Sequence, residues 1–561
     1  MIFSRSNTEF ENYYSTSARL SFIRFSSALL FAVVAVRLIY VQGILRTDLR
    51  EKAERQLPSE MTYKAPRWRI LDRRRLSLAE SVQVQSCYVD PTMLGNKPKT
   101  ADILAQTFDL NSHDLLKKIR ETKGSFLWIK RDVPLLAVNA LKAKKILGVG
   151  FKSESRRHYP LGPLASHAMG LVGFDGRGLS GVEASFDSSL SIKKALVPSS
   201  KPLPPGDVVL TIDSGIQQIV ERELQWGVNK TGAKKGMAIV QDPWTGEILA
   251  MASVPSLSLD PDKPPLADEL RIPPVVDVFE PGSTFKIVAA AGAIEEKLVV
   301  PGEQFSGEKG AMKLAGGLTI HDHEPRQSMT FDDIWTYSSN IGASKIGERL
   351  GSGRLYQYAR LFGFGVFPGS GLPGEAKGFL RPLSQWSGVS KNVVSFGQEV
   401  SVTALQLVGA YSTIANGGRL MEPTLVKGIV SETGDFLWKD NPTEVRRVIT
   451  KSTADRLTQI LVRVVEKGTG QYAQLRWGNQ KVAGKTGTAQ KFDNKDRRYH
   501  SELTLVSFCG FFPADKPAYT MLIVLDEPEG QRWGGVDAAP IFRRIAEQIL
   551  PAKASPGKGE H

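Results

Sequence analysis

The chain is built around the stretch Val278-Phe-Glu-Pro-Gly-Ser-Thr-Phe-Lys-Ile-Val-Ala-Ala290. Its Pro-Gly turn delivers Ser283 to an apolar, alanine-rich run that predicts a buried helix, and Lys286 follows at i+3. Side chains three residues apart share one face of a helix. An ammonium group in such apolar surroundings loses hydration, which lowers its pKa, so the neutral amine can take a proton from a serine hydroxyl. The pattern therefore predicts Ser283 as a nucleophile and Lys286 as its base.

Two further motifs follow this stretch in the chain. S-x-x-K alone is a weak signal, because it also begins at Ser191, Ser306 and Ser555. Ser338-Ser-Asn340 and Lys485-Thr-Gly487 complete, in order, the S-x-x-K, S-x-N and K-T-G set of penicillin-binding proteins and serine β-lactamases. The ordered set is far more specific than any one of its members.

Each of the later motifs has a second occurrence that its context rejects. Ser390-Lys-Asn392 repeats the S-x-N pattern, and Lys230-Thr-Gly232 repeats K-T-G. Lys230 lies in a polar turn, whereas Lys485 ends the apolar run Val482-Ala-Gly484, which predicts a strand. We therefore assign the third motif to Lys485.

The chain resembles a class B penicillin-binding protein and, within that class, the septal transpeptidase of cell division. The resemblance runs from the N-terminal apolar segment to about Pro551. It depends on five motifs, which are Glu280-Pro-Gly-Ser-Thr-Phe-Lys286, Ser338-Ser-Asn-Ile-Gly342, Phe396-Gly-Gln398, Ala483-Gly-Lys-Thr-Gly-Thr-Ala489 and Ala538-Ala-Pro540. Of these, Phe396-Gly-Gln398 is expected to pack under the site rather than to do chemistry.

The resemblance implies acyl transfer on a peptide that ends in D-Ala-D-Ala. Ser283 attacks the carbonyl of the penultimate D-Ala, the terminal D-Ala leaves, and an amine of a neighbouring stem peptide resolves the ester. Lys286 and the hydroxyl of Ser338 relay the proton, and burial and the nearby charge of Lys485 keep Lys286 partly neutral. No metal or organic cofactor is implied, because the serine is the nucleophile.

The other expected site residues hold the substrate. Asn340 offers an amide donor and acceptor to a substrate backbone amide. The substrate carboxylate is expected to meet one ammonium and two hydroxyls, those of Lys485, Thr486 and Thr488. Gly487 lets the peptide lie close to the strand edge, because no Cβ intervenes. The oxyanion hole is expected from two backbone N–H groups, those of Ser283 and Thr488.

At 561 residues, the chain is too long for one ordinary core, so two or three domains are expected. The run Lys201-Pro-Leu-Pro-Pro-Gly206 is a natural boundary. With the resemblance, the expected order is a cytoplasmic tail (1–24), a transmembrane anchor (25–45), a non-catalytic, dimerisation-like pedestal (46–206), a transpeptidase domain (207–551) and a disordered tail (552–561). The expected fold class is α+β, with an elongated α+β pedestal. The catalytic part should be a five-stranded antiparallel sheet with helices on both faces plus an all-helical subdomain.

The predicted anchor, Phe25–Leu45, is long enough to cross a hydrocarbon layer of ~30 Å as a helix. A cleaved signal peptide is disfavoured, because no small-x-small site follows. Arg37 either reaches the far interface or meets a partner helix. Flanking charge does not decide the orientation, but a cell-wall substrate requires the large C-terminal part to be periplasmic. The expected location is therefore the bacterial inner membrane, at the division septum.

The predicted elements of the two folded parts follow the apolar patterns. In the pedestal, Ser81–Val89 alternates like a strand, and Arg69-Ile-Leu-Asp-Arg73, Arg157-His-Tyr-Pro160 and Gly181-Val-Glu183 match the family's signatures. Trp68 and Arg75 stand where the family usually has glycine, so these turns are expected to differ. In the catalytic part, the predicted strands and helices are a hairpin within Gly236–Ala252, strands Val208–Ile212, Leu503–Phe512 and Ala518–Leu525, and helices Ile216–Val228, Phe331–Tyr337, Ala404–Ala415 and Ala538–Leu550.

Charge and cysteine content set further bounds. The formal net charge of +14 is scattered and accompanies a membrane segment, so an anionic lipid or cell-wall polymer is a better partner than nucleic acid. Cys87 and Cys509 are expected to be small buried residues without a disulfide. His321-Asp-His323 could suggest a metal pair, but a loop is the simpler interpretation, because no further ligands accompany it.

The alternatives are other uses of the same site. An elongation transpeptidase is the runner-up, although that branch usually has Asp where this chain has Asn340. A β-lactamase gains nothing from a pedestal, a penicillin-binding sensor needs an effector, and a decayed scaffold would not keep all three motifs. The expected partners are stem peptides with a D-Ala-D-Ala donor and a diamine acceptor, β-lactam antibiotics, a membrane glycosyltransferase of the shape, elongation, division and sporulation class, and divisome proteins.

Overall fold

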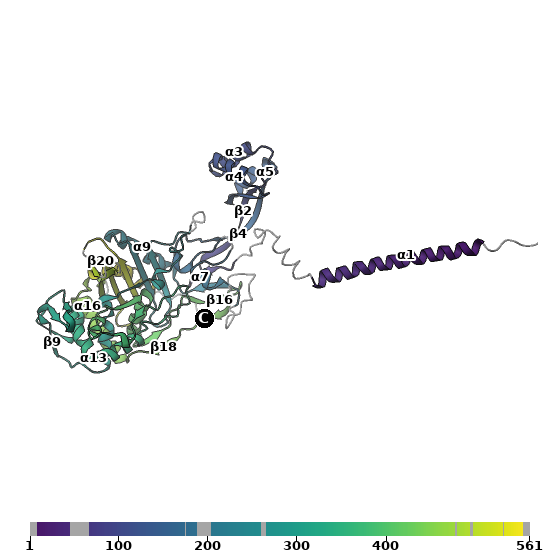
Figure 1. The fold of residues 1–561 in the computed structure, drawn as a ribbon. Helices are drawn as coiled ribbons and strands as arrows, with labels where there is room; N and C mark the ends of the chain where they lie inside the picture. Colours follow the sequence, from purple (N-terminus) through teal and green to yellow (C-terminus); the bar gives the residue numbers. More distant parts are fainter. Residues whose placement is uncertain are drawn as a thin grey trace, which may run out of the picture. The chain divides into compact units, whose positions relative to one another are not determined.

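The computed structural model describes residues 8–44, 67–173, 176–187, 204–259, 265–476, 479–493, 498–530 and 532–553 (Figure 1). The chain divides into two units, Met1–Lys64 and Ala65–His561. Several predictions lie wholly or partly outside the described residues. These are the start of the cytoplasmic tail, the start of the pedestal, the Pro-rich boundary at 201–203 and the end of the C-terminal tail.

The described part of the first unit, residues 8–44, is a long helix. α1 (Thr8–Ile39) continues into a π-helical turn, η1 (Tyr40–Ile44). Its segment Ser21–Gln42 is long and apolar enough to cross a membrane, in agreement with the predicted anchor, which was placed a few residues later. The guanidinium of Arg37 lies 5.5 Å from the centre of the Tyr40 ring on the same helix.

The catalytic part contains the predicted five-stranded antiparallel sheet. Its strand order is β19-β20-β21-β6-β7, and every neighbouring pair is antiparallel. The strands are β6 (Lys235–Gln241), β7 (Ile248–Val254), β19 (Ala483–Asp493), β20 (Arg498–Phe512) and β21 (Tyr519–Asp526). β6, from the start of the catalytic part, thus pairs with β21, from its end. β19 comes first in the strand order, so it is an edge strand.

Helices cover both faces of this sheet, as predicted. α9 (Ser214–Thr231) and α17 (Gly534–Lys553) pack on one face, and α15 (Ala404–Ala415) packs on the other. Successive residues of β20 point to opposite faces of the sheet, and both faces are apolar: Phe508 belongs to the core beneath α17, and Cys509 belongs to the core on the other face. The two cores hold the site's edge strand from both sides.

A helical subdomain lies between the two halves of the sheet in sequence. Its helices are α10 (Pro273–Val276), α11 (Lys286–Glu295), α12 (Phe331–Thr336), α13 (Asn340–Leu361), α14 (Ser390–Val394) and α16 (Lys451–Lys467). α12 begins with a capping box, in which Thr330 and Asp333 satisfy each other's backbone N–H groups. Short strands and turns connect the helices, and they are β8 (Val278–Phe279), β9 (Gln304–Ser306), β10 (Ala311–Lys313), β11 (Thr319–His321), β12 (Ser328–Thr330), β13 (Phe379–Leu380), β14 (Val400–Thr403), β15 (Arg419–Met421) and β18 (Glu444–Arg447).

The pedestal is a mixed sheet with small helices. Figure 1 shows α3, α4 and α5 gathered at one end of β2 and β4. Its elements are β1 (Ile70–Leu71), β2 (Ser77–Val89), α3 (Lys97–Phe108), α4 (Ser112–Glu121), β3 (Leu127–Val133), α5 (Leu135–Ala143), β4 (Val149–His158), α6 (Ser166–Met169) and α7 (Gly181–Ser185). Cys87 is buried here and Cys509 in the catalytic sheet, and both are free, as predicted.

The pedestal sheet also takes strands from beyond the proposed boundary at Gly206. β5 (Asp207–Leu210) runs parallel to β1, and β16 (Val426–Val430) joins β5 and continues to β17 (Phe436–Lys439). The boundary at Gly206 therefore stays a proposal about the order of the domains along the chain. In the folded chain, the strands on either side of it belong to one sheet.

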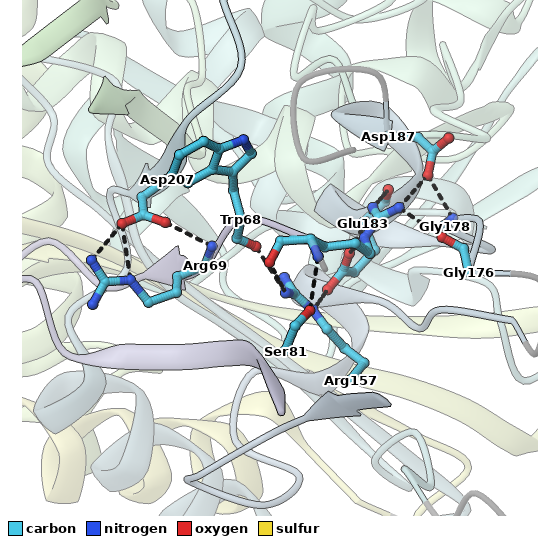
Figure 2. Close-up of polar contacts among 10 residues, drawn as sticks. Trp68, Arg69, Ser81, Arg157, Gly176, Gly178, Glu183, Asp187 and Asp207 are labelled. Carbon is cyan, nitrogen blue, oxygen red and sulfur yellow. Dashed lines mark hydrogen bonds and ion pairs between the residues drawn. The ribbon is translucent and has the colours of Figure 1, made fainter. Parts of the chain in front are cut away.

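Figure 2 shows how charged side chains join the separated pedestal signatures. Glu183 is fully buried and accepts hydrogen bonds from Arg157 Nε at 2.6 Å and from Arg67 Nε at 3.0 Å. Arg157 also donates to the carbonyl of Trp68 at 2.8 Å, and Arg69 Nη2 pairs with Asp207 at 2.6 Å. The signature residues therefore act as electrostatic ties between distant segments.

At Arg75, where the family usually has glycine, the arginine adopts the backbone conformation that glycine would favour. Arg75 has a φ of +72°, a left-handed conformation that normally favours glycine. Its Nη1 donates to the carbonyl of Gly434 at 3.2 Å, and its guanidinium lies 5.1 Å from the centre of the Phe436 ring. Contacts to the β16–β17 hairpin thus accompany the strain, and β1 and β2 still pair.

Candidate active site

Ser283 lies in a tight 3₁₀ turn rather than in an α-helix. The turn, η3 (Gly282–Phe285), leads directly into α11, and the Lys286 N–H donates to the Ser283 carbonyl. In a 3₁₀ turn, residues i and i+3 lie one above the other. Gly282 makes this possible, because its φ is +54° and a Cβ there would lie 2.8 Å from the Thr488 carbonyl oxygen. Ser283 is partly exposed, and its spacing from Lys286 places both residues on one side of the turn.

Buried groups hold this turn from below. The Tyr411 hydroxyl donates to the Thr284 carbonyl at 3.0 Å, deep in the core. The Gly282 N–H donates to the Gly397 carbonyl at 3.2 Å, and a Cβ on Gly397 would lie 2.0 Å from the Gly282 oxygen. This close approach agrees with the packing role predicted for Phe396-Gly-Gln398.

Lys286 reaches the second motif. Its side chain is 1% exposed, and its Nζ lies 2.6 Å from the Ser338 carbonyl oxygen, 2.9 Å from Asn340 Oδ1 and 3.2 Å from Ser338 Oγ. Burial lowers the pKa of Lys286 from 10.5 to about 7, and the carboxylate of Asp322 acts in the opposite direction. The structure therefore brings Lys286, Ser338 and Asn340 together around an amine that can exchange protons near neutral pH.

Ser338 adopts an unusual backbone conformation between α12 and α13. Its φ is +62°, which is uncommon for a residue with a side chain. The next residue, Ser339, caps α13 by accepting a hydrogen bond from the Gly342 N–H at 2.8 Å. This sharp turn directs both the carbonyl and the hydroxyl of Ser338 at Lys286.

The third motif lies on β19, against the nucleophile turn. Lys485 is 1% exposed, and its Nζ is 3.3 Å from both the carbonyl oxygen and the hydroxyl of Thr486. Burial and the neighbouring Lys286 both lower the pKa of Lys485. A Cβ on Gly487 would lie 3.0 Å from Thr284 Cγ2 and 3.1 Å from the Pro281 oxygen, so only glycine lets the strand and the turn lie this close.

The two threonines of the third motif alternate with Lys485 along β19, and the Thr486 hydroxyl still lies 3.3 Å from Lys485 Nζ. The hydroxyl of Thr486 lies 2.7 Å from that of Thr469, and Thr488 Oγ1 accepts from the Gly534 N–H at 3.3 Å. The two predicted oxyanion donors lie on backbone segments that approach each other, since a Cβ on Gly282, which precedes Ser283, would lie 2.8 Å from the Thr488 carbonyl oxygen. All predicted site residues therefore belong to one cluster, formed by η3, the α12–α13 turn and β19.

Sequence reasoning missed Asp322, which it treated only as part of a loop. Its carboxylate accepts from the backbone N–H of Asn340 at 2.6 Å and of Ile341 at 3.0 Å. The capping residue comes from a distant loop, so no local capping pattern announces it. The one available signal is general: the first backbone N–H groups of a helix have no acceptor within the helix, so an acceptor from elsewhere in the chain can be expected.

The fold and this site define a class B penicillin-binding protein. Residues 236–547 match the penicillin binding protein transpeptidase domain, and residues 62–196 match the penicillin-binding protein dimerisation domain. The chain belongs to this family, and it is a serine-type peptidoglycan D,D-transpeptidase.

The chain is similar in sequence to named relatives over nearly its whole length. The chain is 34% identical to the stage V sporulation protein D of Bacillus subtilis, over 95% of this chain and 85% of that protein. It is 31% identical to the probable peptidoglycan D,D-transpeptidase PenA of Neisseria meningitidis, over 95% of this chain and 92% of that one. The crystal structure of penicillin binding protein 3 of Mycobacterium tuberculosis without ligand is similar with a TM-score of 0.68 and 31% identity, covering 88% of this chain and 97% of that chain.

Proposed function

We propose that this transpeptidase cross-links stem peptides through an acyl-enzyme on Ser283, with Lys286 as the base. The observation that carries the proposal is the position of the Lys286 amine, which is buried and lies 2.9 Å from Asn340 Oδ1 and 3.2 Å from Ser338 Oγ. An amine with a pKa of about 7 is partly neutral at neutral pH, so it can accept a proton there.

In the proposed reaction, every proton that one group loses is taken up by another, and the transfers pass through Lys286 and Ser338. As Ser283 Oγ bonds to the penultimate D-Ala carbonyl carbon, its proton passes to Lys286. When the carbon–nitrogen bond to the terminal D-Ala breaks, the proton reaches the leaving amine through the Ser338 hydroxyl. The amine of the acceptor peptide then attacks the ester, loses a proton along the same path, and releases Ser283.

Lys485 is proposed to receive the terminal carboxylate of the substrate. Within the described residues, neither Lys485 nor Lys286 forms an ion pair, so two buried ammonium groups would repel each other. A bound carboxylate near Lys485 would stabilise its charged form and leave Lys286 as the neutral member of the pair. Substrate binding would therefore favour the protonation states that the reaction needs.

β-lactams are proposed to acylate Ser283 in place of the peptide, because they present a carbonyl and, next to it, an anionic carboxylate or sulfonate to the same groups. The similar penicillin binding protein 3 of Mycobacterium tuberculosis has been crystallised with aztreonam, with a TM-score of 0.68 and 30% identity to this chain. This supports β-lactam binding at the site formed here by Ser283, Asn340 and Lys485.

Labelling tests the nucleophile. Purified protein should be labelled covalently by fluorescent penicillin, and Ser283→Ala should remove the label completely. Ser306→Ala is the matched control, since Ser306 begins another S-x-x-K pattern on the exposed strand β9 and should label normally. Persistent labelling of the Ser283→Ala variant would reject the assignment.

The proposed cellular role is septal cross-linking during division. Asn340 supports it, since the elongation branch of the family usually has Asp at this position. The protein would be held in the inner membrane by the Ser21–Gln42 segment, with its large unit in the periplasm, and would act beside a membrane glycosyltransferase and divisome proteins. A fluorescent fusion at mid-cell would support this role. Signal along the side wall would favour elongation, and signal at a forming spore would favour a role like the name of the Bacillus subtilis relative.

A further inference from the structure

We infer that Asp322 is a positioning residue of the transpeptidase reaction, which fixes the Ser338–Asn340 turn against Lys286 and supplies the negative charge that this amine faces. The inference rests on the proposed roles of Ser283 and Lys286. It adds a residue that none of the three sequence motifs contains.

Both carboxylate oxygens of Asp322 are engaged by the start of α13. Oδ1 accepts from the backbone N–H of Asn340 at 2.6 Å and of Ile341 at 3.0 Å, and Oδ2 accepts from the Ser339 hydroxyl at 2.6 Å. The first N–H groups of a helix have no partner within the helix and carry partial positive charge. A carboxylate at this place therefore fixes the register and direction of the whole second motif.

The segment that carries Asp322 is held on both sides of the site. Asn340 Nδ2 donates to the His321 carbonyl at 3.0 Å, so the segment is tied to the second motif again. On the other side, the ring of His323 packs against Trp533, with centres 4.2 Å apart and the ring planes tilted by 35°. Trp533 precedes Gly534, whose N–H donates to Thr488 Oγ1 beside the third motif. The segment that carries Asp322 therefore connects the second motif at the start of α13 with the residues next to the third motif on β19.

The strained turn at Ser338 needs this support. A side chain at a φ of +62° persists only where the surroundings fix it. Asp322 holds the two residues that follow Ser338, and Lys286 Nζ contacts the carbonyl and hydroxyl of Ser338 itself. Loss of Asp322 would allow the turn to relax and would move the Ser338 hydroxyl away from the amine.

The charge of Asp322 also acts on Lys286. The charged groups that face this amine are the carboxylate of Asp322 and the ammonium of Lys485 on β19. Asp322 stabilises the protonated form of Lys286, whereas burial disfavours it, and together they leave its pKa at about 7. Without the carboxylate, the pKa of Lys286 falls further, so the neutral base is present at lower pH.

The test is the pH dependence of acylation of the full chain by fluorescent penicillin. In Asp322→Asn, the acid limb of the rate should move down by about one pH unit or more, since an opposite charge nearby shifts a pKa by roughly 1–3 units. The plateau rate should fall as well, because the amide holds the turn less well. Asp322→Glu should bring the limb back toward that of the unchanged protein.

Two control variants separate charge from structure. Ser339→Ala removes one hydrogen bond of Asp322 but leaves its charge, so it should lower the rate without moving the limb. Asp213→Asn changes a buried aspartate that, like Asp322, caps a helix, through Gly215 N–H at 3.1 Å and Ile216 N–H at 3.2 Å, and it should leave the profile unchanged.

An Asp322→Asn variant with the unchanged pH profile would overturn the inference, even if its rate were lower. So would a shift of equal size in Asp213→Asn. Failure of the proposed function is recognised separately, since it would appear as persistent labelling of Ser283→Ala whatever Asp322 does.

Discussion

The pedestal and the active site each bury a cluster of charged side chains, but the balance of charge differs. In the pedestal, Glu183 is shared by Arg67 and Arg157, and Arg67 also pairs with Asp187 at 2.6 Å. In the site, Lys286 and Lys485 are both 1% exposed, and Asp322, the carboxylate that acts on Lys286, is already engaged by α13. Opposite charges are matched in the first cluster and left unmatched in the second.

This difference separates structural from chemical use of buried charge. A matched buried pair recovers the cost of leaving water through its partner, and its charges stay fixed. An unmatched ammonium recovers less, so its pKa falls and it can exchange a proton at neutral pH. Charge in the pedestal therefore joins segments, and charge in the site moves protons.

The largest effect is expected from Lys286→Met, which keeps the length and burial of the side chain but removes the base. Acylation should slow by about 10²–10⁴-fold, the usual contribution of general acid–base catalysis. The measurement is the second-order rate of labelling by fluorescent penicillin. A variant that folds and is labelled at nearly the normal rate would show that the lysine is not the base.

The same variant also tests the charge balance through stability. The folded-state pKa of Lys286 is about 7 rather than 10.5, so between these values the unfolded chain holds a proton that the folded chain lacks. Stability from this group therefore rises with pH across that window and is lowest below pH 7. Lys286→Met should remove this rise, which denaturation at several pH values would measure.

A large effect on stability is expected from Glu183→Gln. The amide keeps the shape but leaves the buried Arg157 guanidinium without its counter-charge and Arg67 with Asp187 alone, which should cost about 3–5 kcal/mol of unfolding free energy. Asp187→Asn, at the more exposed rim of the same cluster, should cost less. Urea denaturation would measure both, and a shifted pH profile of acylation in Glu183→Gln would contradict the division between the two clusters.

The smallest effect is expected at Arg75, the pedestal counterpart of Ser338 in having a positive φ. Arg75→Gly relieves a left-handed strain of roughly 1–2 kcal/mol but adds freedom to the unfolded chain. It also loses the contacts to Gly434 and Phe436. The net change in the free energy of unfolding, measured by urea denaturation, should stay within about 1 kcal/mol, and the acylation rate should not change. A much larger loss would mean that those contacts, rather than the turn, hold the pedestal strands together.

The parts of the fold that the sequence predicts well are those with local patterns. The alternation of Ser81–Val89 lies within β2, and helix α15 has the predicted bounds, Ala404–Ala415. The hairpin around Asp242 became β6 and β7. α15, β6 and β7 are buried almost throughout, which agrees with their continuous apolar runs.

The parts that escaped prediction depend on contacts between distant residues. Helix α13 was not predicted, because Gly351, with a φ of +78°, interrupts its pattern, and its cap Asp322 comes from another loop. The strand β16 joins the pedestal sheet through pairing with β5, which no local signal reveals. The motifs could name the site residues, but the carboxylate that steadies them became visible only in the folded chain.

The most direct test of the account is to find which atom carries the acyl group. The protein is treated with a penicillin at neutral pH and digested, and the modified peptide is sequenced by mass spectrometry. One added penicilloyl group is expected, on Ser283, and none when the site is blocked beforehand by another β-lactam. An acyl group on a different serine, or stoichiometric labelling of Ser283→Ala, would contradict it.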